Sequence, residues 1–208
     1  VPVVDAAGKV YAEDDGVRPD ASMEGMAKPK PFFDRKYGNI TAANSSQITD
    51  GAAWVLLASE AAVAKWKLDP IGRIVDSQWA GLDPAQMGLG PVHATTPILQ
   101  RQGLQLSDID YWELNEAFAA QVLGCLAAWQ SDDYCREELG LPGALGTIDE
   151  NRLNVDGGAV AIGHPVGASG TRIVLHLLDV LRRNRAKRGI ATICIGGGLG
   201  GAMLVEAL

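Results

Sequence analysis

Segments with strand character and segments with helix character alternate from residue 72 onward, and this alternation limits the folds open to the chain. Apolar or β-branched runs that predict strands lie at Gly72–Trp79, Ile109–Leu114, Ile190–Ile195 and Ala202–Glu206. Helical patterns lie at His93–Arg101, at Glu116–Trp129 and after Gly170, where an apolar stripe at helical spacing comprises Ile173, Val174, Leu177, Leu178 and Leu181. Strands that alternate with helices predict a layered α/β domain in which helices cover a sheet.

The sequence before residue 70 has a different character. Residues 1–38 are rich in proline and in charge, with one helix-like stretch at Ser22–Lys28, and predict surface loops. From Asp50 to Ala64 the chain is rich in alanine and leucine behind an aspartate of the N-cap type, which predicts a mostly buried helix. A new folding unit is expected to begin near Gly72.

The composition excludes several classes of function. With 47% hydrophobic and 21% charged residues, the chain has the make-up of an ordinary globular protein. Its net charge of −7, from 18 Lys and Arg against 25 Asp and Glu, argues against a nucleic-acid partner. The apolar run Ala52–Ala64 is interrupted by Ser59 and Glu60 and is shorter than the roughly 18 residues of a membrane span, so no membrane partner is predicted.

Cysteine usage and the start of the chain bear on location and processing. Cys125, Cys135 and Cys194 occur without a Cys-x-x-Cys pair, which predicts free thiols in a reducing compartment and a cytoplasmic location. No secretory signal pattern is present. Because the sequence begins at Val1, we expect either a processed chain or a piece of something longer. The histidines and cysteines lack metal-ligand spacing, so no metal site is predicted.

Three polar side chains in unusual settings are candidates for chemistry. Asn115 opens Asn-Glu-Ala-Phe, His164 lies in Gly-His-Pro, and Cys194 ends an apolar strand before three glycines. An imidazole, with an unperturbed pKa of about 6.5, is a good base near neutral pH. Backbone N–H groups at Gly196–Gly198 could stabilise a thiolate or a developing oxyanion. Each residue also has a structural interpretation: Asn115 as an N-cap, His164 as a packing residue, and Cys194 as a small buried hydrophobe.

Two long blocks carry a resemblance to a known family. The run Asn154–Arg172 and the block Cys194–Met203 closely resemble the thiolases, enzymes of acyl-coenzyme A chemistry, and the resemblance extends upstream to about Asn39. It implies the thiolase-like layered α-β-α fold, with the C-terminal domain at 70–208 and the final segment of the N-terminal domain at 39–69. Residues 1–38 would then be part of the cofactor-covering loop region.

The resemblance implies a role for each candidate residue. Asn115, through a bound water, and His164 would form an oxyanion hole for the thioester oxygen, and the backbone N–H of Gly196 would belong to a second hole. His164 would also deprotonate a nucleophilic cysteine, and Cys194 would exchange a proton with the substrate carbon. Further contacts implied with coenzyme A or the acyl chain come from Ser46 at the pantetheine arm, more loosely Arg18 and Phe33, and Met87 and Phe118 in the acyl pocket. Coenzyme A would be a substrate, and no tightly bound cofactor is expected.

The chain also departs from the family pattern. Gln47 stands where thiolases commonly have glycine, and Ser131–Arg152 is longer than expected, which predicts an extra surface excursion. No motif of a nucleophilic cysteine surrounds Cys125 or Cys135. The resemblance therefore implies the C-terminal portion of a thiolase, with the nucleophile on a partner chain that carries the N-terminal half, and a dimer or tetramer of the complete unit.

The implied reaction transfers an acyl group between coenzyme A thioesters. It would convert 3-ketoacyl-coenzyme A and coenzyme A to acyl-coenzyme A and acetyl-coenzyme A, as in fatty acid metabolism, or run as the reverse Claisen condensation. The alternative is a non-catalytic acyl-coenzyme A binding or regulatory subunit of the same fold. The presence of Asn115, His164 and Cys194 together favours the enzyme, because a binding module has no need for all three.

Overall fold

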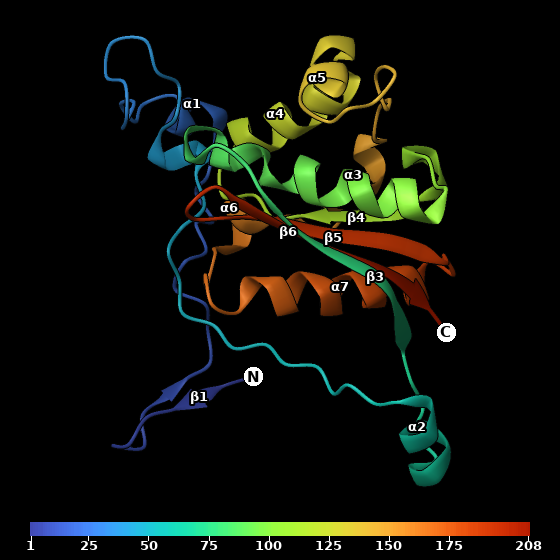
Figure 1. Cartoon of the computed structure of the whole chain (residues 1–208). Coiled ribbons are helices and arrows are strands. Elements are labelled where there is room, and N and C mark those ends of the chain that lie inside the picture. Colours follow the sequence, from blue (N-terminus) through green and yellow to red (C-terminus); the bar gives the residue numbers. More distant parts are fainter.

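A mixed four-stranded sheet forms the centre of the computed structural model, which describes residues 1–208 (Figure 1). The strand order is β3-β6-β5-β4, with bounds Gly72–Gly81 for β3, Tyr111–Leu114 for β4, Arg188–Ile195 for β5 and Leu199–Ala207 for β6. β6 runs antiparallel to both of its neighbours, and β4 runs parallel to β5. All the strands predicted from the sequence are present, although β4 is shorter than its apolar run.

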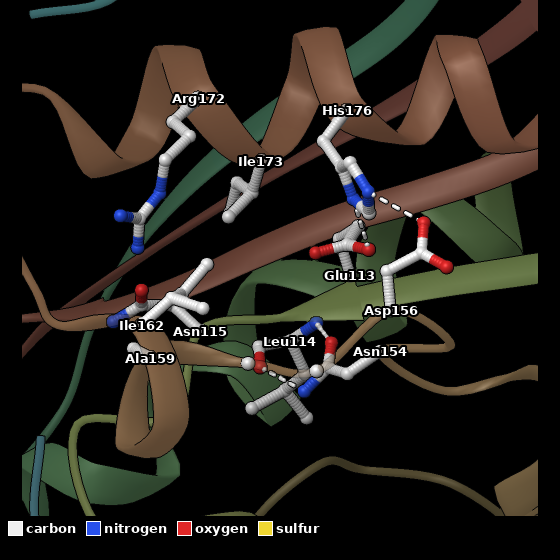
Figure 2. A pocket seen from close by; sticks show the side chains of 12 residues that line it. Glu113, Leu114, Asn115, Asn154, Asp156, Ala159, Ile162, Arg172, Ile173 and His176 are labelled. Atoms are coloured by element: carbon white, nitrogen blue, oxygen red, sulfur yellow. Dashed lines mark hydrogen bonds and ion pairs between the residues drawn. The ribbon is translucent and has the colours of Figure 1, made fainter. Parts of the chain in front are cut away.

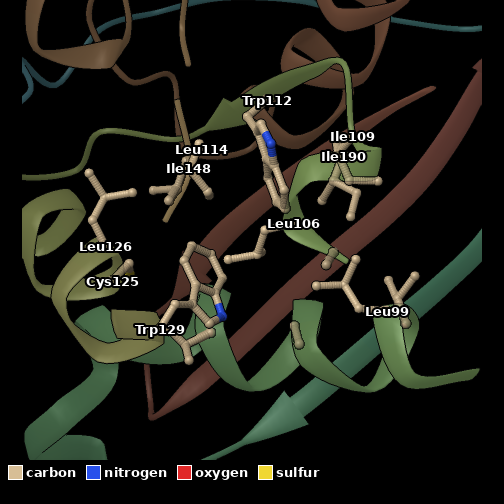
Figure 3. Close-up of a cluster of buried hydrophobic side chains, with 14 of the residues drawn as sticks. Leu99, Leu106, Ile109, Trp112, Leu114, Cys125, Leu126, Trp129, Ile148 and Ile190 are labelled. Atoms are coloured by element: carbon tan, nitrogen blue, oxygen red, sulfur yellow. The ribbon is translucent and has the colours of Figure 1, made fainter. Parts of the chain in front are cut away.

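Helices cover both faces of this sheet, which confirms the predicted layered α/β architecture (Figure 1). Helices α3 (Gly90–Gln102) and α4 (Ala119–Gln130) lie on one face, and α7 (Ser169–Arg183) lies on the other. The larger core, between the sheet and α3 and α4, is built around Trp112 and Trp129, whose ring centroids are 5.9 Å apart (Figure 3). The smaller core holds the predicted apolar stripe of α7, with Ile173, Leu177, Leu178 and Leu181 buried and Val174 packed beside them.

One close approach of backbones joins α3 to the sheet. A side chain at Gly200 in β6 would collide with the backbone of Gly90, and a side chain at Gly90 would collide with the Leu199 carbonyl. Both positions therefore require glycine. This contact holds the start of α3 against β6, the second strand of the hairpin that follows Cys194. It thereby also places the 3₁₀ helix η2 (Pro84–Leu89), which directly precedes α3.

The predicted buried helix over Asp50–Ala64 is wrong. Only Glu60–Trp66 (α2) is helical, capped by Ser59, and the residues before it are extended. Trp54, Leu56 and Leu57 are 89%, 85% and 71% exposed. An amphipathic or apolar run becomes a stable helix mainly by packing, and although Gly51 lies against Pro165, the large apolar side chains of this run are exposed.

The remaining elements are short. Residues 1–38 are mostly exposed, as predicted, and contain a small hairpin of β1 (Val3–Val4) and β2 (Val10–Tyr11) and the helix α1 (Met23–Met26) capped by Ser22. Other short elements are η1 (Ala42–Asn44), η3 (Leu106–Asp108), α5 (Asp132–Glu137), η4 (Glu150–Arg152) and α6 (Ala159–Ile162). None of the helices has the length and apolar character needed to cross a bilayer.

The segment Ser131–Arg152 is only partly the surface excursion that the sequence predicts. It contains α5, whose Cys135 is fully buried, and its Ile148 belongs to the larger core. Its other residues are mostly exposed or half-buried. The extra length therefore packs as a cap over α4 instead of projecting freely into solvent.

Candidate functional site

Three segments that are distant in sequence meet beyond the carboxyl end of β4. They are the loop Asn115–Phe118, the glycine-rich run 154–168, and residues 45–49. The amide of Ser46 donates to Ala117 O over 2.9 Å, and the amide of His164 donates to Gln47 O over 2.8 Å. The segment 45–49 thus lies between the other two and holds them together. Gln47, the residue that departs from the family pattern, contributes its backbone carbonyl to this contact.

Asn115 and His164 are brought into direct contact. Asn115 Nδ2 lies 3.4 Å from His164 Nε2, and the Asn115 side chain is only 2% exposed. The N-cap interpretation of Asn115 is wrong, because α4 begins at Ala119 and its N-cap residue is Phe118. The backbone N–H of Asn115 instead donates to Thr192 O over 3.0 Å, which extends the pairing of β4 with β5 by one residue. Asn115 is therefore placed by the sheet and not by the helix.

The tautomer of His164 follows from its second ring contact. His164 Nδ1 lies 2.7 Å from the Oγ of Ser169, which is fully buried, and that hydroxyl donates to Pro165 O over 3.2 Å. Since the hydroxyl proton is used, Nδ1 carries the hydrogen and Nε2 keeps its lone pair toward Asn115. Burial, assisted by the nearby charge of Arg172, lowers the pKa of His164. The ring is therefore a neutral base with Nε2 as its proton acceptor.

Glu116 fixes the glycine-rich run to the loop after β4, a role that sequence reasoning missed. Its carboxylate accepts from Asn154 Nδ2 over 2.8 Å and from the Val160 amide over 3.2 Å. Gly158 lies directly against this carboxylate, and any side chain there would collide with it. The adjacency of Glu116 to Asn115 and the glycine pair at 157–158 are the signals that could have revealed it.

Asn154 was likewise missed as a functional position. Its Oδ1 accepts from the Leu114 amide and its Nδ2 donates to the Leu114 carbonyl, both over 2.9 Å. Its own amide donates to Trp112 O over 2.9 Å. Asn154 thus pairs with the backbone of β4 as a neighbouring strand would. Its φ of 48° is left-handed, a conformation that asparagine adopts more readily than most residues. The glycine-rich run starts from this fixed point.

Cys194 lies near the end of β5, opposite Gly200 of β6, and is 7% exposed. Burial raises the pKa of its thiol, so the resting group is protonated at neutral pH. This state suits a proton donor better than a thiolate. Gly196 lies in the exposed turn between β5 and β6, which passes through left-handed backbone at Gly197 and Gly198. No hydrogen bond joins Cys194 to His164 or Asn115.

The other two thiols are packing residues. Cys125 is fully buried, donates to Gly88 O over 3.3 Å, and has its pKa raised by burial to about 12. Cys135 is fully buried and donates to Ala128 O over 3.4 Å. All the cysteines are unpaired. All three are buried, whereas a reactive thiol is partly exposed.

The residues predicted to contact coenzyme A and the acyl chain are only partly brought together. Phe33 packs edge-to-face on Phe118 with ring centroids 6.1 Å apart, although Phe33 is otherwise exposed. Ser46 lies beside the same loop through its bond to Ala117. Met87 lies in η2, and Arg18 is exposed without an ion-pair partner. The structure therefore groups Phe33, Phe118 and Ser46 near Asn115 and His164, whereas no hydrogen bond or ion pair joins the Arg18 side chain to them.

A second polar cluster, also missed from the sequence, borders a cavity of about 110 Å³ between α7 and the end of β4 (Figure 2). Glu113, His176 and Asp156 form a continuous hydrogen-bonded chain in it. Asn115 lines the same cavity, and its Oδ1 is buried without a hydrogen-bond partner. This cluster therefore lies directly behind the Asn115–His164 pair.

Comparison with known proteins identifies the family. The model of the thiolase C-terminal domain matches residues 68–207, and that of the thiolase N-terminal domain matches residues 1–61. The chain belongs to the thiolase family, as the resemblance of its motifs implied. It is 44% identical over 195 residues to the 3-ketoacyl-CoA thiolase of Yersinia enterocolitica, a match that covers 93% of this chain and 45% of the relative.

Solved structures agree with the sequence match. The acetyl-CoA acetyltransferase of Bacillus anthracis superposes with a TM-score of 0.84 at 37% identity, covering 100% of this chain and 49% of that one. Human mitochondrial 3-ketoacyl-CoA thiolase in complex with CoA gives 0.78 at 35% identity, covering 100% and 48%. The thiolase-like α/β fold is thereby confirmed. The chain spans about half the length of the relatives it matches.

Proposed function

We propose that this chain supplies the C-terminal portion of a thiolase that transfers acyl groups between coenzyme A thioesters. The observation that carries the proposal is the Asn115–His164 pair, in which Ser169 fixes a neutral ring whose unprotonated Nε2 can act as a base. The relatives named 3-ketoacyl-CoA thiolase and acetyl-CoA acetyltransferase support this substrate class. Both are acyltransferases, and coenzyme A is bound in the human structure.

The first half-reaction uses His164 and Cys194 in turn. His164 Nε2 takes the proton of a nucleophilic cysteine thiol, and the thiolate attacks the keto carbon of 3-ketoacyl-coenzyme A. Asn115 and His164 stabilise the negative oxygen. The carbon–carbon bond then breaks, its electron pair goes to the leaving acetyl-coenzyme A carbanion, and Cys194 gives that carbon its proton. Backbone N–H groups, with that of Gly196 among them, stabilise the enolate oxygen.

The second half-reaction restores both groups. The thiol of incoming coenzyme A gives its proton to the Cys194 thiolate and attacks the acyl-enzyme carbonyl. The nucleophilic cysteine leaves as a thiolate and recovers its proton from His164. The proton held on His164 thus returns to the nucleophilic cysteine, and the proton that Cys194 gave to carbon is replaced by the one from coenzyme A. The products are acyl-coenzyme A and the free enzyme.

The nucleophilic cysteine lies outside these 208 residues. Cys125 and Cys135 are fully buried and packed against backbone carbonyls, and Cys194 is already assigned to the proton transfer at carbon. We assign the nucleophile to a partner chain that carries the N-terminal half, and we expect the complete unit to be a dimer or tetramer. The dimeric yeast peroxisomal thiolase, with a TM-score of 0.81, supports such an assembly.

Coenzyme A binding is assigned to the first part of the chain. Residues 1–38 would be the cofactor-covering loop region, residues 39–69 the end of the N-terminal domain and residues 70–208 the C-terminal domain. Ser46, Arg18 and Phe33 would contact coenzyme A, and Met87 and Phe118 would contact the acyl chain. We place the protein in the cytoplasm, and its unpaired thiols support a reducing compartment.

Labelling and intact mass together test this function. The purified protein, with every polypeptide that accompanies it, is incubated with labelled acetyl-coenzyme A and then digested. We expect a second polypeptide, and label on one of its cysteines, together with thiolysis of 3-ketoacyl-coenzyme A. Coenzyme A binding without label or turnover would instead favour the non-catalytic subunit. A lone 208-residue chain with full turnover would overturn the partner assignment.

A further inference from the structure

One polar face of α7 contacts the glycine-rich run at several points. Ser169, Arg172 and His176 are spaced by three and four residues, so they lie on the same side of the helix. Ser169 accepts from His164, and Arg172 Nη2 donates to Gly163 O over 2.8 Å. His176 lies farther along this face and points toward the end of β4 (Figure 2). The helix that orients His164 is thus also in contact with β4.

His176 bridges two carboxylates. Its Nδ1 lies 2.8 Å from Glu113 Oε1 and its Nε2 lies 2.9 Å from Asp156 Oδ2. The Glu113 side chain is 6% exposed, and the Asp156 carboxylate also accepts from Arg183 Nη2 over 2.6 Å. Ionised carboxylates only accept hydrogen bonds, so a ring that satisfies both must carry hydrogen on both nitrogens. Each bond is charge-assisted and therefore stronger than a neutral one.

We propose that His176 is a positioning residue, which as an imidazolium donates to Glu113 and to Asp156 and so sets the separation of Asn115 from His164. Glu113 lies two residues before Asn115, and Asp156 lies in the glycine-rich run that leads to His164. The bridge joins these two segments through α7. The inference deepens the proposed function, on which its catalytic consequence rests.

The surroundings supply the charges that such a bridge needs. Charged and titratable groups face it from β4 and the loop after it, from the glycine-rich run and from α7, namely Tyr111, Glu113, Glu116, Asp156, Arg172, Asp179 and Arg183. Arg183 lowers the pKa of Asp156, which keeps that carboxylate ionised. Burial raises the pKa of Glu113, and His176 opposes this effect. A protonated His176 therefore favours the ionised form of Glu113.

Other hydrogen bonds join α7 to the glycine-rich run, from Arg172 to Gly163 and from Arg183 to Asp156, but they do not reach β4. Glu116 and Asn154 tie the beginning of the glycine-rich run to β4, but neither contacts α7. Among the side chains of α7, only His176 is hydrogen-bonded to β4. Loss of the bridge would allow the start of α7, with Ser169, to shift relative to Asn115. A displacement of about 1 Å at a catalytic group can cost about 10²-fold in rate.

Nitrogen-15 NMR of the histidine rings tests the protonation directly. This chain has only 3 histidines, so His93→Gln and His176→Gln variants assign all of its ring signals when it alone is labelled with nitrogen-15 and is combined with its unlabelled companion polypeptides. At pH 7.5, above the ordinary histidine pKa of about 6.5, we expect both nitrogens of His176 to be protonated and His164 to be the neutral Nδ1–H tautomer. A His176 ring with one bare nitrogen would overturn the proposal. This readout does not depend on turnover.

Turnover then tests the positioning. His176→Gln should shift the His164 ring signals and lower kcat by about 10- to 100-fold, with KM for acyl-coenzyme A within about twofold. His93→Gln is the matched control, because His93 lies on the opposite face of the sheet and bonds only to Tyr134. It should leave the His164 signals and kcat unchanged. A folded His176→Gln protein with unaltered His164 signals and kcat would overturn the inference. Wild-type protein without any turnover would instead contradict the proposed function, but it would not contradict the hydrogen-bonded bridge at His176.

Discussion

His164 donates a hydrogen bond from Nδ1 to Ser169, over 2.7 Å, across the turn that joins the glycine-rich run to α7. The two residues are five positions apart, and Pro165 between them supplies the carbonyl that accepts the Ser169 hydroxyl. One short segment of sequence thus selects the tautomer of its own histidine. The base is prepared before any substrate arrives.

Substitution of Ser169 should disturb the orientation of the His164 ring without weakening substrate binding. Ser169→Ala removes the acceptor for Nδ1–H, so we expect kcat to fall by about 10- to 100-fold with little change in KM. Stability should fall by about 1 kcal/mol, the usual net value of one hydrogen bond. Steady-state kinetics and thermal unfolding measure the two effects. Ser77→Ala, on an exposed position of β3, is the control, and equal activity of the two variants would count against the assigned tautomer.

The amide of Asn115 should matter for catalysis more than for folding. Loss of one positioned oxyanion donor typically lowers kcat by about 10²–10³-fold, so Asn115→Ala should show that loss in thiolysis of 3-ketoacyl-coenzyme A. Asn115→Asp keeps the size of the side chain but has no N–H donor. Full activity of Asn115→Asp would exclude the amide from the oxyanion hole.

Cys194 should be required far more for carbon–carbon bond cleavage than for acylation by acetyl-coenzyme A, because coenzyme A can leave as a thiolate without a proton donor whereas a carbanion cannot. Cys194→Ala should nearly abolish thiolysis, because no group remains to protonate the leaving carbanion, while labelled acetyl-coenzyme A still acylates the partner's cysteine. Cys135→Ala is the matched control, since it removes a buried thiol far from this chemistry and should retain kcat. Near wild-type thiolysis by Cys194→Ala would show that Cys194 is not the proton donor to the leaving carbanion.

The pH dependence should have an acid limb that belongs to His164. Because burial and Arg172 lower the pKa of His164 below its ordinary value of 6.5, the folded state disfavours the protonated ring. The unfolded chain then binds more protons than the folded chain, so stability should decrease as pH falls below 6.5 and be unaffected by this group above it. kcat/KM should fall at a pH lower than 6.5 for the same reason. A pH profile of kcat/KM with its acid midpoint above 6.5 would contradict the tautomer and burial of this ring.

Local patterns predicted those elements whose packing lies within the chain. The stripe of α7 and the strands β5 and β6 are present because their apolar faces meet one another across the sheet. The run Asp50–Ala64 has a helix-forming composition, but composition alone does not stabilise a helix without a surface to cover. Similarly, Glu116 looked like the first residue of a helix, whereas the sheet keeps Asn115 extended and frees its side chain for His164.

The candidate site was predictable only in part, for a related reason. Asn115, His164 and Cys194 stand in recognisable blocks of sequence. The partners of His176 do not, because Glu113 is 63 residues away in the chain and Asp156 is 20 residues away. Ser169 could have been inferred from its closeness to His164, but the direction of its hydroxyl requires the position of Pro165. Hydrogen bonds between distant segments are a property of the fold.

The extended run before α2 offers a way to measure whether the chain is associated with a companion polypeptide. Trp54, Leu56 and Leu57 project into solvent, and the backbone around them has no regular secondary structure. Such a segment fits the extended cleft of a protease, and chymotrypsin cuts after side chains of this kind. Cleavage beside Trp54 should therefore be rapid in the free chain and slow whenever a companion covers this run, so that a simple digestion time course measures assembly without any assay of turnover.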